Sequence, residues 1–70
     1  MLKQITFKQW IKQYQEELTM RGKLARYAKH SAFPNEFMTI CDYLDEVDGT
    51  DVMELTFYDA WDDFERDMKR

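Results

Sequence analysis

Two side chains of this 70-residue sequence, Cys41 and His30, are of the types used in nucleophilic catalysis, where a thiolate attacks and an imidazole takes the proton. Cys41 lies between Ile40 and Leu44 on an apolar stripe, and burial among apolar side chains raises the pKa of a thiol and makes it unreactive. His30 follows Lys29 near the expected end of a helix, where a histidine often hydrogen-bonds terminal carbonyls. We therefore expect Cys41 to be a packing residue, His30 to have a local role, and the protein not to be an enzyme.

Acidic side chains crowd the region around Gly49 and could hold a cation: Asp42, Asp45, Glu46, Asp48 and Asp51. A calcium-binding loop needs oxygen ligands at alternating positions before its glycine and a glutamate six residues after it. Leu44 stands at the first of these positions and Leu55 at the last, so the motif is absent. The sequence therefore predicts a solvated acidic surface, with no metal site and no cofactor.

Charge is divided unevenly between the two halves of the chain. Residues 1–34 contain seven lysines and arginines against two glutamates, whereas residues 35–70 contain three against twelve aspartates and glutamates. The balances of +5 and −9 sum to the net charge of −4. Such a molecule can bind acidic groups with one surface and basic groups with another.

Six cations of the N-terminal half fall into two groups, which are Lys8 with Lys12 and then Arg21 with Lys23, Arg26 and Lys29. They could contact an acidic protein or follow a phosphate backbone. However, the isoelectric point of about 4.8 is far below the strongly basic value expected of a dedicated nucleic-acid binder. A third interpretation is that these cations balance the acidic half within the same fold.

The acidic side chains of the C-terminal segment follow the outside of a predicted helix, at Asp59, Asp62, Asp63, Glu65 and Asp67. Like charges four residues apart repel by a few tenths of a kcal/mol each. Arg66 has the spacing to pair with Asp62. This row either serves solubility or binds a basic partner.

Apolar residues recur at helical spacing in the segments that must position these charges. The first stripe consists of Phe7, Trp10, Ile11, Tyr14 and Leu18. It predicts a helix over residues 7–18, which Thr6 and Gln9 begin with the spacing of a capping box.

Three further helical segments follow, and no segment alternates with the period of a strand. A short helix over residues 22–29 ends before Phe33-Pro34, and Asn35 is expected to cap the next helix, which stops at Asp48-Gly49. Residues 51–55 are expected to form one separate turn, and Thr56 to cap the last helix. The sequence thus predicts a single all-α domain over residues 1–70, a compact bundle of four to five short helices around an aromatic core.

Five short motifs in this order resemble the YozE-like family of small bacterial proteins, which have a SAM-like (sterile alpha motif-like) domain. They are Thr6-Phe7 with Trp10-Ile11, Gly22-Lys23-Leu24-Ala25, Phe33-Pro34, Ile40 with Tyr43-Leu44, and Phe57-Tyr58-Asp59-Ala60-Trp61. The resemblance implies a SAM-like bundle in a cytoplasmic bacterial protein and implies no known reaction. A cytoplasmic location also fits the single cysteine and the absence of any apolar run near the ~18 residues that span a membrane.

We therefore expect a small non-enzymatic interaction module that binds a protein partner or itself, and no membrane. The residues expected to bind are Lys23, Arg26 and Lys29 on the basic side and Asp59, Asp62 and Asp63 on the acidic side. The alternative is nucleic-acid binding, through Lys8, Lys12, Lys23 and Arg26.

Overall fold

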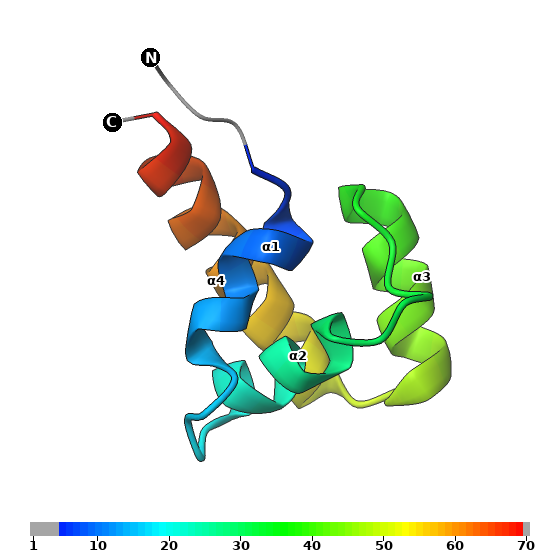
Figure 1. Cartoon of the computed structure of the whole chain (residues 1–70). Helices are drawn as coiled ribbons and strands as arrows, with labels where there is room; N and C mark the ends of the chain where they lie inside the picture. Colours follow the sequence, from blue (N-terminus) through cyan, green and yellow to red (C-terminus); the bar gives the residue numbers. More distant parts are fainter. Residues whose placement is uncertain (1–4, 70) are drawn as a thin grey trace.

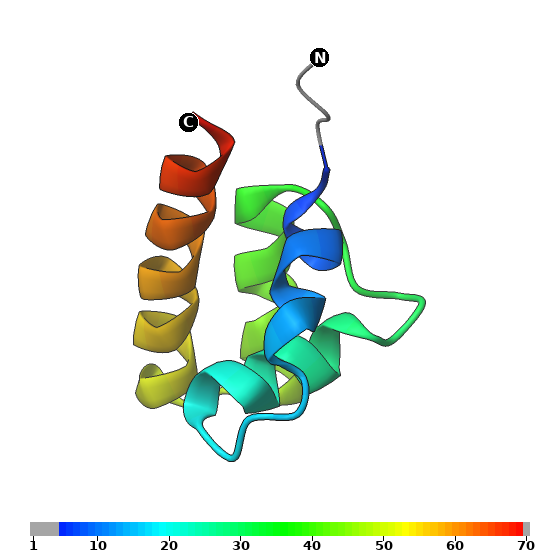
Figure 2. The same ribbon diagram turned by 60° about the vertical axis from the view of Figure 1, so that its left-hand side comes forward.

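The computed structural model describes residues 5–69 as a compact bundle of helices, and no strand occurs among them. The helices are α1 (Phe7–Ile11), the 3-10 turn η1 (Lys12–Tyr14), α2 (Met20–Ala28), α3 (Phe37–Val47) and α4 (Asp51–Met68). α4 is the longest helix and packs against α1, α2 and α3 (Figure 1). Seen from the side, α3 and α4 lie next to each other and are joined by a short turn (Figure 2). The prediction of a compact all-α bundle is confirmed.

The first helix begins as predicted and ends earlier. Thr6 and Gln9 form the capping box, with the Thr6 hydroxyl accepting from the Gln9 amide at 3.2 Å and the Gln9 side chain accepting from the Thr6 amide at 3.1 Å. The chain leaves the α-helix after Ile11 and tightens into η1, so the prediction of a helix through residue 18 is wrong. Leu18, which was assigned to the apolar stripe, is 98% exposed. The chain must turn here because Thr19 already caps α2, its hydroxyl accepting from the amide of the third helical residue.

Gly22 lets this turn lie directly against α2. A Cβ atom at Gly22 would be 2.0 Å from the carbonyl oxygen of Glu17, which is closer than any side-chain carbon can approach. The absence of a side chain is therefore required for the turn before α2 to lie this close to the helix.

α3 begins and ends close to the predicted positions, with one correction. Glu36 rather than Asn35 occupies the N-cap position, and no side chain caps the helix there. The predicted stop at Asp48-Gly49 is confirmed, since Gly49 has a φ of 72°, in the left-handed region that glycine adopts without strain.

The predicted break between residues 51–55 and the last helix is wrong, because both belong to one helix, α4. Thr50 caps it, with its hydroxyl accepting from the Met53 amide at 3.2 Å. Thr56, the predicted cap, lies inside α4, and its hydroxyl donates to the carbonyl of Val52 at 2.7 Å. A threonine can satisfy its hydroxyl on the preceding turn in this way, so the helix continues through it.

The core is a cluster of aromatic rings centred on Phe7, which is 1% exposed. Its ring centroid lies 5.8 Å from Trp10, 5.3 Å from Phe57, 5.2 Å from Trp61 and 5.6 Å from Phe64. Two of these contacts, with Phe57 and Phe64, are edge-to-face, the geometry that the ring quadrupoles favour. The expectation that aromatic rings from separate helices share one interior is confirmed.

We expect Phe7→Ala to lower the free energy of unfolding by about 3–5 kcal/mol, because the ring is buried and the surrounding helices can only partly close the cavity. Such a loss is most of the stability of a domain this small. Leu18→Ala, which removes an exposed side chain, should change it by no more than about 0.5 kcal/mol. Urea denaturation measures both values, and equal losses in the two variants would contradict this description of the core.

We expect Gly22→Ala to lower the melting temperature, although alanine is favoured over glycine in a helix by about 1 kcal/mol. The added methyl group would collide with the Glu17 carbonyl, so α2 and the preceding turn would have to separate. Glu65→Ala, at an exposed position of α4, should leave the melting temperature nearly unchanged or raise it. Circular dichroism follows all three proteins, and a Gly22→Ala variant as stable as the parent would show that the turn shifts without cost.

Candidate functional site

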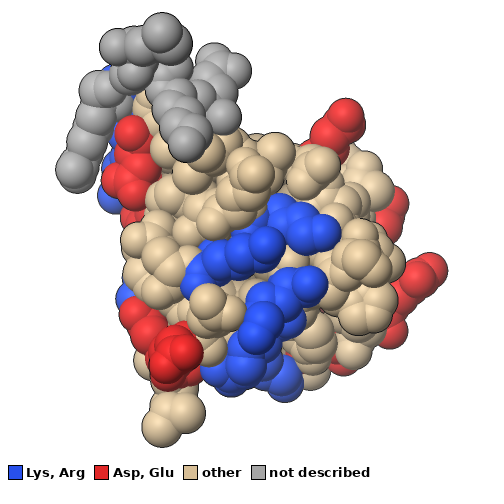
Figure 3. Space-filling model, in the orientation of Figure 1, with Lys and Arg blue, Asp and Glu red and all other residues tan. Residues whose placement is uncertain are grey.

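Five cations of the N-terminal half lie on α1, η1 and α2 or directly after α2, and we call them the basic face: Lys8, Lys12, Lys23, Arg26 and Lys29. Figure 3 shows lysine and arginine side chains gathered in the middle of one face, over α1 and α2, with acidic side chains toward its margins. All of these residues are exposed except Lys8, which is partly buried. The fold therefore brings the two sequence groups of cations onto neighbouring helices.

Two of these cations also hold the fold together. Arg26 donates from Nη1 to the carbonyls of Gln15 and Glu17, at 3.1 Å and 2.9 Å, and so satisfies backbone acceptors of the turn before α2. Lys23 forms an ion pair with Asp48, with 3.3 Å between Nζ and Oδ2. Substituting either residue would thus disturb folding as well as any binding.

The other three cations of the basic face differ in the hydrogen bonds that their ammonium groups make. The Lys8 ammonium group donates to the carbonyls of Ser31 and Phe33 at 3.4 Å and 3.5 Å, across the connection between α2 and α3. Within residues 5–69, the ammonium groups of Lys12 and Lys29 take part in no hydrogen bond or ion pair. These two side chains are consequently the part of the basic face that is available to a partner without cost to the fold.

Asp48, predicted from the sequence only as a helix stop and as part of the acidic surface, makes several contacts within the fold. Its side chain is 3% exposed and accepts from the Tyr27 hydroxyl at 2.8 Å, from the Thr50 amide at 3.1 Å and from the Thr50 hydroxyl. The hydrogen bonds from Thr50 and Tyr27, with Lys23 nearby, lower the pKa of Asp48 to about 2. The same hydrogen bond to Asp48 raises the pKa of Tyr27. These contacts fasten α2 to the turn between α3 and α4.

Within residues 5–69, Lys23–Asp48 is the one ion pair that joins the basic half to the acidic half. Arg21 pairs with Glu17 inside the N-terminal half. The interpretation that the two halves neutralise each other therefore applies to Lys23 and not to the basic face as a whole.

Three predicted acidic site residues lie together on one side of α4, and we call them the α4 row: Asp59, Asp62 and Asp63. They line a shallow groove of about 530 Å³ against the first residues of α2, including Arg21. Arg66 pairs with both Asp62 and Asp63, which confirms the predicted Asp62–Arg66 pair and reduces the negative charge at that end of the row.

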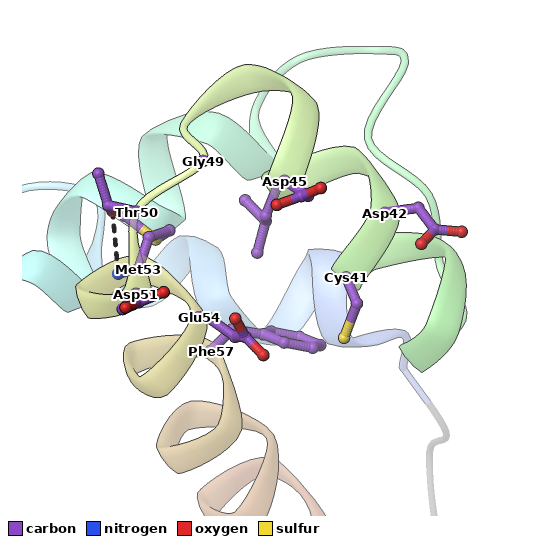
Figure 4. A pocket seen from close by; sticks show the side chains of 10 residues that line it. Cys41, Asp42, Asp45, Gly49, Thr50, Asp51, Met53, Glu54 and Phe57 are labelled. Carbon is purple, nitrogen blue, oxygen red and sulfur yellow. Dashed lines mark hydrogen bonds between the residues drawn. The ribbon is translucent and has the colours of Figure 1, made fainter.

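A second groove, of about 210 Å³, lies between α3 and α4 and was not foreseen from the sequence. Figure 4 shows Asp42 and Asp45 along its α3 side, Asp51 and Glu54 along its α4 side, and apolar side chains between them. The apolar residues that line it are Leu44, Met53 and Phe57. The sequence spacing places Asp42 and Asp45 beside the apolar stripe of α3, and Asp51 and Glu54 beside that of α4. It does not predict that these sides of the two helices face each other.

Cys41 is partly buried and packs against the core, as expected of a packing residue, and it also lines the α3–α4 groove. Burial, followed by the charges of Glu54 and Asp42, raises the pKa of the thiol, which is the direction expected of an unreactive cysteine. His30 has a local role of a different kind from the one expected, since its Nδ1 atom accepts from the Ala32 amide at 3.2 Å.

Residues 5–69 hold no group of three or more His, Cys, Asp or Glu side chains arranged to bind a metal ion. Among the helices of the same residues, none has both the length and the apolar character needed to cross a membrane.

Comparison of the chain with protein family models, with characterised proteins and with solved structures found no match. The resemblance to the YozE-like family therefore stays a prediction that depends on the five sequence motifs.

We expect Asp48→Asn to lower the melting temperature at pH 7, because the neutral amide is a weaker acceptor for Thr50, Tyr27 and Lys23. The pKa of Asp48 falls on folding, from about 4 in an unfolded chain to about 2 in the structure. The carboxylate thus stabilises the fold fully above about pH 4, and this contribution disappears as the pH falls through 2. The difference in melting temperature between parent and variant should be constant above pH 4 and shrink between pH 4 and 2.

Glu46→Gln, which removes the charge of an exposed carboxylate one turn before the α3–α4 connection, is the matched control. It should show a much smaller difference at every pH. A difference for Asp48→Asn that persisted undiminished at pH 2 would contradict the lowered pKa.

Proposed function

We propose that the protein is a non-enzymatic interaction module that binds a protein partner, or a second copy of itself, through oppositely charged surfaces. The observation that carries the proposal is the separation of charge in three dimensions. Cations gather over α1 and α2 (Figure 3). Asp59, Asp62 and Asp63 lie together on one side of α4. Lys12 and Lys29 provide cations without internal contacts within residues 5–69, which an acidic partner can engage directly.

The bundle of short helices is compatible with the SAM-like fold that the sequence motifs imply. SAM-like folds elsewhere serve as protein-interaction or nucleic-acid-binding modules, and by this analogy we propose a cytoplasmic protein in which the surfaces, rather than a catalytic site, carry the function. The analogy concerns the fold class, so the charged residues named above remain the basis of the proposal.

Contact between the basic face of one copy and the α4 row of another would be heterologous, since two different surfaces meet. Each exposed ion pair contributes only about 0.2–1 kcal/mol. Several such pairs give a weak association that salt suppresses, because charges are screened over about 10 Å at 0.1 M ionic strength. A heterologous contact leaves the basic face unoccupied at one end of the assembly and the α4 row unoccupied at the other. Further copies can therefore bind at both ends.

We expect sedimentation velocity at low salt, about 0.02 M, to show association of the parent that about 0.5 M salt abolishes. The double variant Lys12→Glu/Lys29→Glu should be monomeric, and so should Asp59→Lys/Asp63→Lys. An equimolar mixture of the two double variants should stop at a dimer, because each contributes its one intact surface. Lys69→Glu, a cation outside the basic face, should associate like the parent.

A parent that stays monomeric at low salt and high concentration would refute self-association, and a mixture that stays monomeric would refute this pair of surfaces.

Nucleic-acid binding through Lys8, Lys12, Lys23 and Arg26 is the second candidate, supported by the placement of these four residues on adjoining helices. The affinity should then fall linearly with salt on logarithmic axes, with a slope of about −0.9 for each phosphate neutralised on duplex DNA. Electrophoretic titration at low salt tests this directly. The absence of any shift for both duplex and single-stranded probes would exclude the candidate.

A further inference from the structure

The α3–α4 groove has an apolar interior that continues onto exposed apolar side chains at its edges. Met38, 70% exposed, stands one helical turn before Cys41 and Asp42 on the side of α3 that borders the groove. Leu55, 62% exposed, stands one turn after Asp51 on α4. Long apolar side chains exposed on both edges of an apolar hollow are typical of a surface that another molecule covers.

The charge around this groove has one sign. Asp42, Asp45, Asp51 and Glu54 line it, and neither lysine nor arginine is among its lining residues. The ion pairs within residues 5–69 involve other carboxylates, at Glu17, Asp48, Asp62 and Asp63. The four groove carboxylates are thus not neutralised by any cation in the described part of the chain. Their field repels nucleic acids and anionic lipid surfaces and attracts cations.

Neighbouring hydroxyl and thiol groups respond to these carboxylates in the direction expected. The Tyr58 hydroxyl donates to Glu54 at 2.7 Å, and this hydrogen bond, with burial and the charge of Glu54, raises the pKa of Tyr58 to about 12. Glu54 and Asp42 also contribute to the raised pKa of the Cys41 thiol, after burial. Both groups therefore keep their protons at neutral pH.

The dimensions of the groove suit side chains of a protein segment better than a separate small molecule. Its volume of about 210 Å³ is below the ~300 Å³ at which pockets for drug-sized ligands begin. Its lining on α4 runs from Asp51 to Phe57, which at 1.5 Å per residue is about 9 Å, or more than one and a half turns of a helix lying alongside. A helix placed between two others presents residues at positions i, i+3 or i+4, and i+7 to such a groove.

We propose that the α3–α4 groove docks an amphipathic helix of a partner protein, whose apolar stripe covers the groove and whose flanking lysines or arginines meet its four carboxylates. The apolar stripe would pack on Leu44, Met53 and Phe57 and cover the two exposed edges. The cations would determine the orientation and the rate of association. This contact uses neither the basic face nor the α4 row, so it does not depend on the proposed function above.

A synthetic helical peptide of about 15 residues, with leucines at helical spacing and lysines on both flanks, is the probe. It would be titrated into the full-length, isotopically labelled protein and followed by amide chemical shifts. We expect shifts concentrated in residues 38–45 and 51–58. A peptide of the same leucine pattern with glutamates in place of lysines should produce none. Shifts centred on another surface, or equal shifts with both peptides, would overturn the proposal.

Two pairs of variants separate docking from general attraction to a negatively charged protein. Asp45→Lys, inside the groove, should weaken peptide binding by about tenfold or more, because it replaces a close attraction with repulsion. Glu46→Lys makes the same change of charge at the next residue, outside the groove, and should weaken it less than about threefold. Leu55→Ala should likewise weaken binding more than Leu18→Ala, which removes an exposed leucine elsewhere. Equal effects within either pair would overturn the proposal.

Melting temperatures of the four variants, all at exposed positions, establish that each one folds. The Lys12→Glu/Lys29→Glu variant should bind the peptide like the parent, which distinguishes this site from the charged surfaces of the proposed function. If Asp45→Lys abolished self-association while the peptide did not bind, the groove would receive a second copy of the chain, and the partner helix proposed here would be refuted.

Discussion

The contact of the Phe7 ring with rings on α4 is the interaction on which the rest of the structure depends. α1 is only five residues long and could not be stable alone, since isolated helices of that length do not form in water. It exists because its capping box begins it and Phe7 anchors it among Phe57, Trp61 and Phe64. Once α1 is held on α4, the basic side chains of α1 and η1 have a defined position.

A second constraint joins the other end of the molecule. Asp48 accepts hydrogen bonds from Tyr27 and Thr50 and pairs with Lys23, so α2 is fastened to the α3–α4 connection where Gly49 reverses the chain. This attachment fixes α3 beside α4, and the α3–α4 groove is a consequence of that placement. A nearly buried carboxylate is stable here because every one of these partners lies within bonding distance.

The two constraints also divide the charged residues by role. Lys23, Arg26 and Lys8 are oriented by acceptors inside the fold, whereas Lys12 and Lys29 extend into solvent without such acceptors in the described residues. On the acidic side, Arg66 offsets part of the α4 row, while no lysine or arginine of residues 5–69 lines the α3–α4 groove. Formal charge counted along the sequence therefore differs from the charge that each surface presents to a partner.

Local patterns in the sequence were enough to determine the all-α class, the aromatic composition of the core, the capping box at Thr6 and the chain reversal at Gly49, because each depends on residues within a few positions of one another. Local patterns also placed the basic residues on α1 and α2, and Asp59, Asp62 and Asp63 on one side of α4. They failed for Leu18 and Thr56, since the turn before α2 and the uninterrupted course of α4 follow from contacts that helical periodicity does not contain. Only the tertiary structure decided which cations are held by acceptors inside the fold and that Asp48 joins α2 to the α3–α4 turn. It also decided that acidic sides of α3 and α4 face each other across an apolar groove. The physical reason is that these features join residues far apart in the sequence, through packing and long side chains.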